Sequence, residues 1–165
     1  MAKSQRRSPE RTMPLTIRKA EASDEPLIRL LLGRVKLPIE SVGKDTTTFY
    51  VGTERETIVA VAGYEFYGED ALLRSVAIEP GLQKKGIGSQ LVDSMLSIAK
   101  RRGIKRVVLL TDTAPKFFAR KGFVVTERSA IQNEGLKRSS EFSYLCPTSS
   151  ICMVFEFPKI KDSQF

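Results

Sequence analysis

Residues 72–92 read LLRSVAIEPGLQKKGIGSQLV and combine several structural signals in one short segment. It begins as an apolar strand, passes through a turn and a glycine-bearing loop, and continues as an amphipathic helix. Gly86 and Gly88 allow the backbone to approach a ligand closely, directly before the helix begins. The amides at a helix N-terminus attract anions. The stretch therefore predicts a phosphate-binding cradle at residues 83–89.

The spacing of the glycines excludes two common phosphate motifs. The dinucleotide fingerprint needs a third glycine two residues further on, and a Walker loop needs eight residues that end in Lys and Ser or Thr. The form here is Gln-x-x-Gly-x-Gly, from Gln83 to Gly88. Glycines before a helix can also serve close packing alone, so the pattern needs support from the rest of the chain.

This form resembles the motif with which the GNAT acetyltransferase superfamily holds the pyrophosphate of acetyl-coenzyme A. Residues 114–123, APKFFARKGF, are similar to the superfamily's helix and turn that end in Gly-Phe. Residues 144–153, YLCPTSSICM, together with Leu72–Ser75, are similar to a GNAT subgroup associated with arsenic-resistance gene clusters. The resemblance extends over residues 15–157.

Length and composition fit one domain. The chain has 165 residues, 41% of them hydrophobic, which is enough for one core and too few for two. We expect a disordered basic tail at 1–13, the acetyltransferase domain at 14–158 and a short tail at 159–165. No apolar run reaches membrane-spanning length, and Cys146 and Cys152 are too few for a disulfide scaffold, which predicts a cytoplasmic protein.

The net charge of +8 fits two kinds of partner, nucleic acid and the phosphates of coenzyme A. No zinc-ligand spacing and no aromatic-rich ribonucleoprotein strand is present, so nucleic acid is not expected. The chain has no histidine, which removes the commonest metal ligand, and no metal is expected. A homodimer is left open.

The hydrophobic periodicity predicts an α/β (α+β) fold, and the resemblance implies a mixed, mainly antiparallel sheet flanked by helices in a single GNAT-like domain. Glycine-bearing turns and helix-capping residues indicate where the expected strands and helices begin and end. We expect strands at 15–19, 47–53, 57–66, 71–78, 106–111, 123–127 and 151–157, and helices after residue 23, after the cradle and at 113–121. The family arrangement adds a short helix, for which 35–41 is available; 129–147 has no definite prediction.

The resemblance also implies the binding site of acetyl-coenzyme A, the expected cosubstrate. The backbone of Val76, Ala77 and Ile78 would pair with the pantetheine arm. A helix near residue 114 would line the thioester. The pyrophosphate would be held by Gln83, Lys84, Lys85, Gly86, Ile87, Gly88 and Ser89, and the residues expected on the helix are Phe117 and Phe118.

Two usual catalytic groups of the superfamily are missing here. Leu72 replaces a glutamate, and Phe118 replaces a tyrosine. A hairpin loop at 67–70 would place Glu65 opposite Leu72 and on the same sheet face as Arg74. We therefore expect Glu65 to be the base, directly or through water, and Arg74 to bind a carboxylate or oxyanion of the substrate. The alternative is a structural ion pair on a solvated sheet face.

The expected function is acetyl-coenzyme A-dependent N-acetylation of a small-molecule amine, such as an amino acid or an arsenic-containing amino acid. Ser75 is a further expected substrate contact, and one of several possible proton donors to the leaving thiolate. Alternatives are acetylation of a protein or aminoglycoside, and a non-catalytic sensor of acetyl-coenzyme A or arsenic. Cys146 and Cys152 have two alternative interpretations, packing in the core or a loop and binding of arsenic(III).

Overall fold

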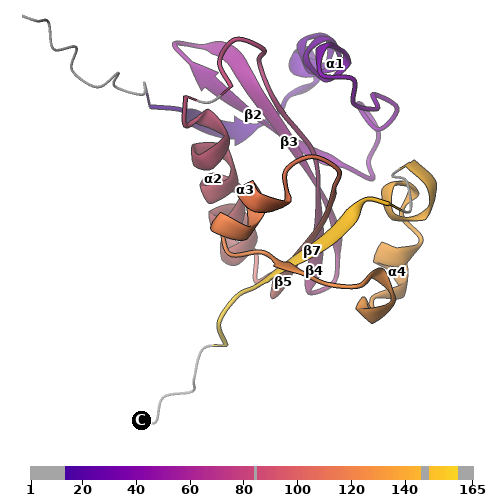
Figure 1. Cartoon of the computed structure of the whole chain (residues 1–165). Coiled ribbons are helices and arrows are strands. Elements are labelled where there is room, and N and C mark those ends of the chain that lie inside the picture. The colour runs from indigo at the N-terminus through magenta and orange to yellow at the C-terminus, as the bar shows by residue number, and fades with distance from the viewer. Residues whose placement is uncertain (1–13, 84, 146–148, 160–165) are drawn as a thin grey trace, which may run out of the picture.

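The computed structural model describes residues 14–83, 85–145 and 149–159, and confirms the α/β single domain that the sequence predicts. One sheet of seven strands has the order β1-β2-β3-β4-β5-β7-β6 (Figure 1). Neighbouring strands are antiparallel except β4 and β5, which are parallel. The strands are β1 (Thr16–Lys19), β2 (Thr48–Glu54), β3 (Thr57–Tyr67), β4 (Asp70–Ile78), β5 (Arg106–Thr111), β6 (Val124–Val125) and β7 (Ile151–Glu156).

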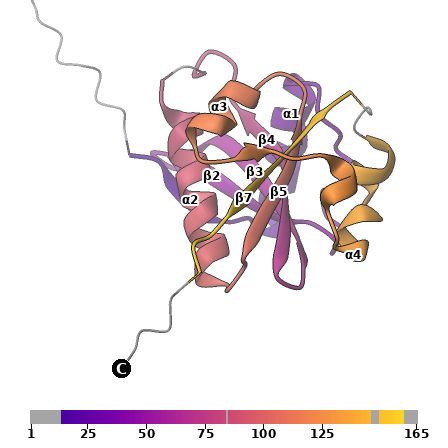
Figure 2. The same ribbon diagram turned by 60° about the horizontal axis from the view of Figure 1, so that its bottom comes forward.

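Helices cover both faces of the sheet. The helices are α1 (Glu25–Arg34), α2 (Ile87–Arg101), α3 (Pro115–Arg120) and α4 (Glu134–Lys137), with short helical turns η1 (Ala22–Asp24), η2 (Arg128–Ala130) and η3 (Glu141–Leu145). Figures 1 and 2 show α2 and α3 on one face, and α1 and α4 on the other. Side chains alternate between the faces of a strand, so each layer has its own apolar cluster.

The β3–β4 hairpin has the predicted register. Glu65 pairs with Leu72, and Phe66 pairs with Ala71, as the four-residue loop implies. The β2–β3 hairpin turns at Arg55 and Glu56, which both adopt positive φ angles, +50° and +68°. Such angles give a tight two-residue turn whose twist matches that of the strands.

A bulge interrupts β4 at Ser75, a non-glycine residue with φ of +56°. Gly63 pairs with Arg74 and Val61 pairs with Ala77, so β4 has one residue more than β3 at this point. The parallel ladder between β4 and β5 ends at Leu72 and Val108, although both strands continue beyond it. The C-terminal part of β4 is thus not paired with β5.

Several predicted boundaries differ from the structure. Residues 35–41 form turns and not a helix, because Pro38 interrupts the segment and Lys36 has a positive φ of +61°. The strand expected at 123–127 is reduced to the two residues of β6. The segment 129–147 contains α4 and the turns beside it. The tail expected at 1–13 lies outside the described residues, and so does the tail expected at 159–165 except for its first residue.

Candidate active site

The first turn of α2 is open to an anion. Gly86 is the N-cap residue, its φ of +83° lies in the left-handed region, and no side chain caps the helix. The amides of the first helical residues, Ile87, Gly88 and Ser89, have no partner within the helix, because their acceptors would lie before its start. No acidic residue lies in this turn. Its positive end therefore suits a bound anion.

Aromatic side chains from α3 lie behind the cradle. A Cβ atom added to Gly88 would have the Phe117 ring as its nearest neighbour, at 3.6 Å. Phe118 is buried instead, and its ring stacks edge-on against Phe117 and Phe123, with centroids 5.1 and 5.6 Å away. The structure thus brings Phe117 to the cradle and places Phe118 in the core.

The remaining expected cofactor residues lie at the C-terminal end of β4 and in the loop that follows. Val76 and Ile78 are half-buried, and Ala77 is buried against the α1 side of the sheet. The Gln83 side chain donates a hydrogen bond to the carbonyl of Ile78 at 3.4 Å, which ties the loop to the strand. Lys84 lies outside the described residues, and Lys85 is exposed.

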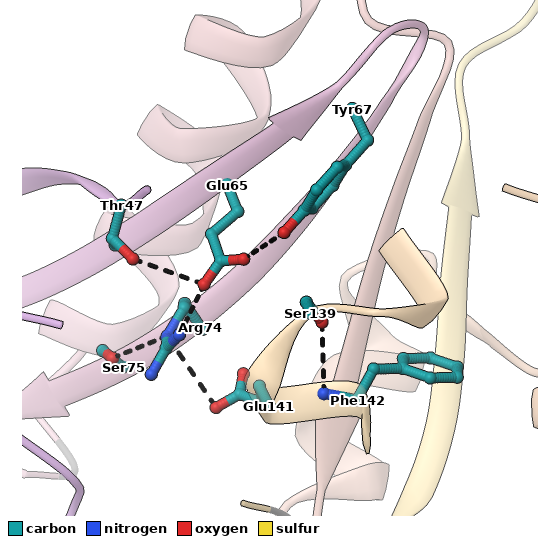
Figure 3. Close-up of polar contacts among 8 residues, drawn as sticks. All are labelled: Thr47, Glu65, Tyr67, Arg74, Ser75, Ser139, Glu141 and Phe142. Atoms are coloured by element: carbon teal, nitrogen blue, oxygen red, sulfur yellow. Dashed lines mark hydrogen bonds and ion pairs between the residues drawn. The ribbon is translucent and has the colours of Figure 1, made fainter. Parts of the chain in front are cut away.

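Glu65 and Arg74 form a buried ion pair on the α1 and α4 face of the sheet (Figure 3). Each residue is 3% exposed, and Arg74 Nη1 lies 2.5 Å from Glu65 Oε2. Thr47 donates a hydrogen bond to the same oxygen at 3.3 Å, and the Tyr67 hydroxyl donates to Glu65 Oε1. The ion pair of the alternative interpretation is thus present, but the solvated face expected for it is wrong, because both side chains are buried.

Burial is the largest cause that raises the pKa of Tyr67 above its usual range, and its hydrogen bond to the Glu65 carboxylate raises it further. Tyr67 therefore stays protonated and acts as a donor. A hydrogen bond with the Ser139 side chain acts in the opposite direction and lowers the pKa of Tyr67 in part. We conclude that Tyr67 orients Glu65.

The guanidinium of Arg74 has further neighbours on its other edge. Its Nε atom lies 3.4 Å from Ser75 Oγ and 3.9 Å from Glu141 Oε1 (Figure 3). Its Nη2 atom is buried and has no hydrogen-bond partner within the described part of the chain. Buried guanidinium N–H groups without a partner are rare in native proteins. This atom is therefore available to an oxygen of a ligand.

The structure brings Glu65 and Arg74 together as the hairpin register predicted, and places Ser75 beside them. Three further neighbours were not predicted. Glu141 comes from η3, in the segment without a definite prediction. Thr47 begins one predicted strand, and Tyr67 directly follows another. The alternation of side chains along a strand was the signal that could have placed both on the same face as Glu65. No comparable signal pointed to Glu141.

Leu72 and Phe118, the two positions at which the resemblance implies catalytic groups, also have apolar surroundings in the structure. Leu72 is fully buried among side chains beneath α4, and Phe118 is 7% exposed. Cys152 lies in the same cluster as Leu72, and burial raises the pKa of its thiol to about 11. The packing interpretation thus suits Cys152. Cys146 lies outside the described residues.

Comparisons with known proteins agree with this geometry. Residues 45–125 match the family model described as "Acetyltransferase (GNAT) domain". An amino-acid acetyltransferase of Mycobacterium tuberculosis is 28% identical over 128 residues, which cover 72% of this chain and 73% of the relative. The crystal structure of Rv2747 from Mycobacterium tuberculosis, in complex with CoA and NLQ, has a TM-score of 0.70 and 25% identity, and covers 87% of this chain and 99% of its own.

More distant structures share the fold. The N-acetylglutamate synthase of Neisseria gonorrhoeae, complexed with coenzyme A and L-arginine, has a TM-score of 0.71 at 19% identity. The match covers 88% of this chain and 34% of that chain. Among the described residues, no helix is long and apolar enough to span a membrane. The same residues contain no group of three or more His, Cys, Asp or Glu side chains placed to hold a metal ion.

Proposed function

We propose that the chain, of which residues 45–125 match the GNAT acetyltransferase family, transfers the acetyl group of acetyl-coenzyme A to the amino group of a small amino acid. The domain type and the cosubstrate follow from the matched family and from relatives bound to coenzyme A. The acceptor and the roles of individual residues are the content of the proposal.

The observation that supports an amino acid is the free Nη2 atom of Arg74. A guanidinium binds a carboxylate through parallel N–H donors, and the carboxylate of an amino acid would supply the acceptor that Nη2 lacks. Ser75 and Glu141 lie beside the same guanidinium, so they would border the acceptor. The similarity to a protein named as an amino-acid acetyltransferase supports the same class of substrate.

Acetyl-coenzyme A supplies an activated acetyl thioester to this site. We assign its pyrophosphate to the cradle residues 83–89, and its pantetheine arm to the backbone of Val76, Ala77 and Ile78. Two observations support the assignment. The first turn of α2 has uncapped amides, and β4 is not paired with β5 beyond Leu72. Extended ligands commonly pair with a free strand edge.

Glu65 is the proposed base. Its carboxylate offers about four lone-pair sites, of which three accept hydrogen bonds from Arg74, Thr47 and Tyr67. The remaining site, on Oε1, accepts the proton of the acceptor amine directly or through one water. Phe118 cannot donate a proton to the leaving group. Coenzyme A leaves as a thiolate, and because the ordinary pKa of a thiol is about 8.5, the thiolate can leave without a dedicated acid.

Arsenic-containing amino acids are a narrower proposal within this class. They present the same carboxylate to Arg74 and the same amino group to the base. The similarity of residues 144–153 to the arsenic-associated subgroup supports this choice. Cys152 is not part of it, because its thiol is buried and has a raised pKa.

The test is the release of free thiol from acetyl-coenzyme A in the presence of matched acceptors. Each amino acid, including those with arsenic in the side chain, is paired with the amine that remains after removal of its carboxyl group. We expect turnover with the amino acids and at least tenfold less with the paired amines, since a lost charge-assisted hydrogen bond costs about 1.5–3 kcal/mol. Equal rates within each pair would contradict the role of Arg74.

A second outcome would change the function itself. The apolar residues at Leu72 and Phe118 remove two usual catalytic groups, which favours a non-catalytic binding protein as the second candidate. Calorimetric binding of coenzyme A, measured alongside turnover, separates the two. Binding without turnover for any acceptor class, including polyamines, proteins and aminoglycosides, would support the second candidate.

A further inference from the structure

Lys121 follows the last residue of α3 and reaches across to the N-terminal part of α2. Its ammonium nitrogen lies 2.7 Å from Ser89 Oγ and 2.6 Å from Asp93 Oδ1. The Lys121 side chain is 16% exposed, so it is largely enclosed between the two helices. Ser89 and Asp93 are four residues apart on α2 and share one face of the helix. One ammonium therefore bridges both.

The position is unusual for a cation. Ser89 is the third residue of α2, and its amide belongs to the cradle at the positive end of the helix. A positive charge near a helix N-terminus is unfavourable unless an anion accompanies it. Asp93 offsets part of this charge, but its side chain is 65% exposed and screened by water. A bound phosphate would complete the neutralisation.

The hydrogen bond from Lys121 also determines how the Ser89 hydroxyl can interact with a ligand. A hydroxyl has one proton and two acceptor lone pairs. Because an ammonium donates only, Ser89 Oγ must be the acceptor in its contact with Lys121. The hydroxyl proton of Ser89 then remains available to an acceptor on the ligand, and the adjacent positive charge strengthens it as a donor.

The backbone that holds Lys121 is closely packed. Gly122 follows it with φ of +100°, and a Cβ atom there would lie 2.9 Å from the Phe155 ring. The amide of Lys121 donates to the carbonyl of Phe118 at 3.0 Å. The Phe117 ring, on the same helix, faces Gly88. These contacts hold the Lys121 ammonium beside the cradle.

We propose that Lys121 is a positioning residue for the pyrophosphate of coenzyme A, which acts through Ser89. It orients the Ser89 hydroxyl as a donor to a phosphate oxygen and adds positive charge to the cradle. This inference rests on the proposed cradle at residues 83–89. Lys121 lies outside that cradle in sequence and outside its Gln-x-x-Gly-x-Gly pattern.

The experiment measures affinity for two probes, coenzyme A by calorimetry and pantetheine, which lacks the phosphates, by NMR titration. The variants are Lys121→Met, Lys121→Arg, Ser89→Ala and the double variant Lys121→Met/Ser89→Ala. The control is Lys100→Met, which removes the same charge from an exposed lysine at the far end of α2. Thermal unfolding without ligand checks that each variant is folded.

We expect Lys121→Met to weaken coenzyme A binding about tenfold, as one charge-assisted hydrogen bond implies, and to leave pantetheine binding unchanged. Lys121→Arg should recover most of the affinity, and Lys100→Met should match the wild type. In the Ser89→Ala background the Lys121→Met change should have a much smaller effect, since the two residues act as one unit.

Two results would overturn the inference while leaving the cradle intact. One is that Lys121→Met binds coenzyme A as tightly as Lys100→Met does. The other is that it loses coenzyme A and pantetheine to the same extent, which indicates a general structural role. Failure of the wild-type protein to bind coenzyme A more tightly than pantetheine would instead contradict the cradle itself.

Discussion

Glu65 lies directly opposite Leu72 in the β3–β4 ladder, and its carboxylate contacts Arg74, two residues further along β4. An acidic group is thus present on the sheet face of Leu72 but on the neighbouring strand. Leu72, the position at which the family resemblance implies a glutamate, is apolar, and the acid on the neighbouring strand has a cationic partner. This relationship determines what substitution of each residue should do.

Replacement of Glu65 by Gln tests the proposed base. The amide cannot accept a proton near neutral pH, so we expect kcat to fall about a hundredfold. The Tyr67 and Thr47 contacts can persist, because an amide oxygen also accepts hydrogen bonds. Glu69→Gln, on an exposed hairpin turn, is the control. An unchanged kcat in Glu65→Gln would remove Glu65 from the mechanism.

Removal of Arg74 alone should strongly destabilise the protein. Arg74→Met leaves the buried Glu65 carboxylate without its cation, which costs about 3–5 kcal/mol in comparable buried pairs. The double variant Glu65→Gln/Arg74→Met removes both charges and should regain most of that loss. Urea unfolding of the two single variants and the double variant measures this coupling. Strictly additive changes in unfolding free energy would show that the pair is not coupled.

Asp24 should make the free energy of unfolding depend on pH in the acidic range. Hydrogen bonds from Arg18 and from the Glu21 amide lower the pKa of Asp24 from 3.8 to about 2. The lowered pKa contributes stability that is complete above pH 4 and is lost as the pH falls toward 2. We expect about 1–2 kcal/mol, because Arg18 is partly exposed to solvent.

Urea unfolding of wild type and Asp24→Asn at pH 7 and pH 3 measures this contribution. The difference in unfolding free energy should be largest at pH 7 and smaller at pH 3. Asp45→Asn, the same change on an exposed loop, should show no such difference. A constant difference for Asp24→Asn at both pH values would show that its carboxylate does not titrate with folding.

Cys152 should be unreactive in the folded protein. Its thiol is buried and its pKa is raised to about 11, so little thiolate is present at pH 8. In a Cys146→Ser variant, Cys152 is the remaining cysteine of the sequence. We expect a thiol reagent or arsenite to react with it only after addition of denaturant. Rapid reaction in the native state would restore arsenic binding by Cys152 as a hypothesis.

Two glycine substitutions should have opposite effects. A Cβ atom at Gly63 would lie 2.9 Å from Thr47 Cγ2 and 3.2 Å from Phe49, so Gly63→Ala must displace Thr47 from Glu65. We expect a loss of about 1–3 kcal/mol in stability, together with lower activity. Gly33→Ala, in α1 with open space around it, should stabilise by about 0.4–1 kcal/mol. Thermal unfolding and thiol-release assays test both.

Local sequence patterns were enough for the regular elements and for one long-range relationship. The β3–β4 register followed from the hairpin loop, because side-chain alternation is strict once a turn is fixed. The bulge at Ser75 was not foreseen, since a non-glycine residue with positive φ leaves no mark on the sequence. The short helix that the family arrangement implied at 35–41 is wrong, because Pro38 interrupts the segment and Lys36 has a positive φ.

The covering layer of the site depended on tertiary contacts. Residues 129–147 have neither a clear helical nor a strand period, and their turns are held by contacts with the sheet, such as Asn133 with Tyr67. Glu141 comes from this segment, so its position beside Arg74 was not predictable. Burial of Glu65 and Arg74 was missed for the same reason: the layer that excludes water from them comes from that segment.

The short parallel ladder between β4 and β5 has a mechanical consequence. In the described part of the chain, the two halves of the sheet are joined there by three residue pairs, Asp70–Arg106, Ala71–Val107 and Leu72–Val108. The antiparallel β3–β4 and β5–β7 ladders on either side are longer. Under a force that pulls β4 away from β5, this short ladder should therefore break before the longer ladders on either side of it, and β1–β4 would separate from β5–β7.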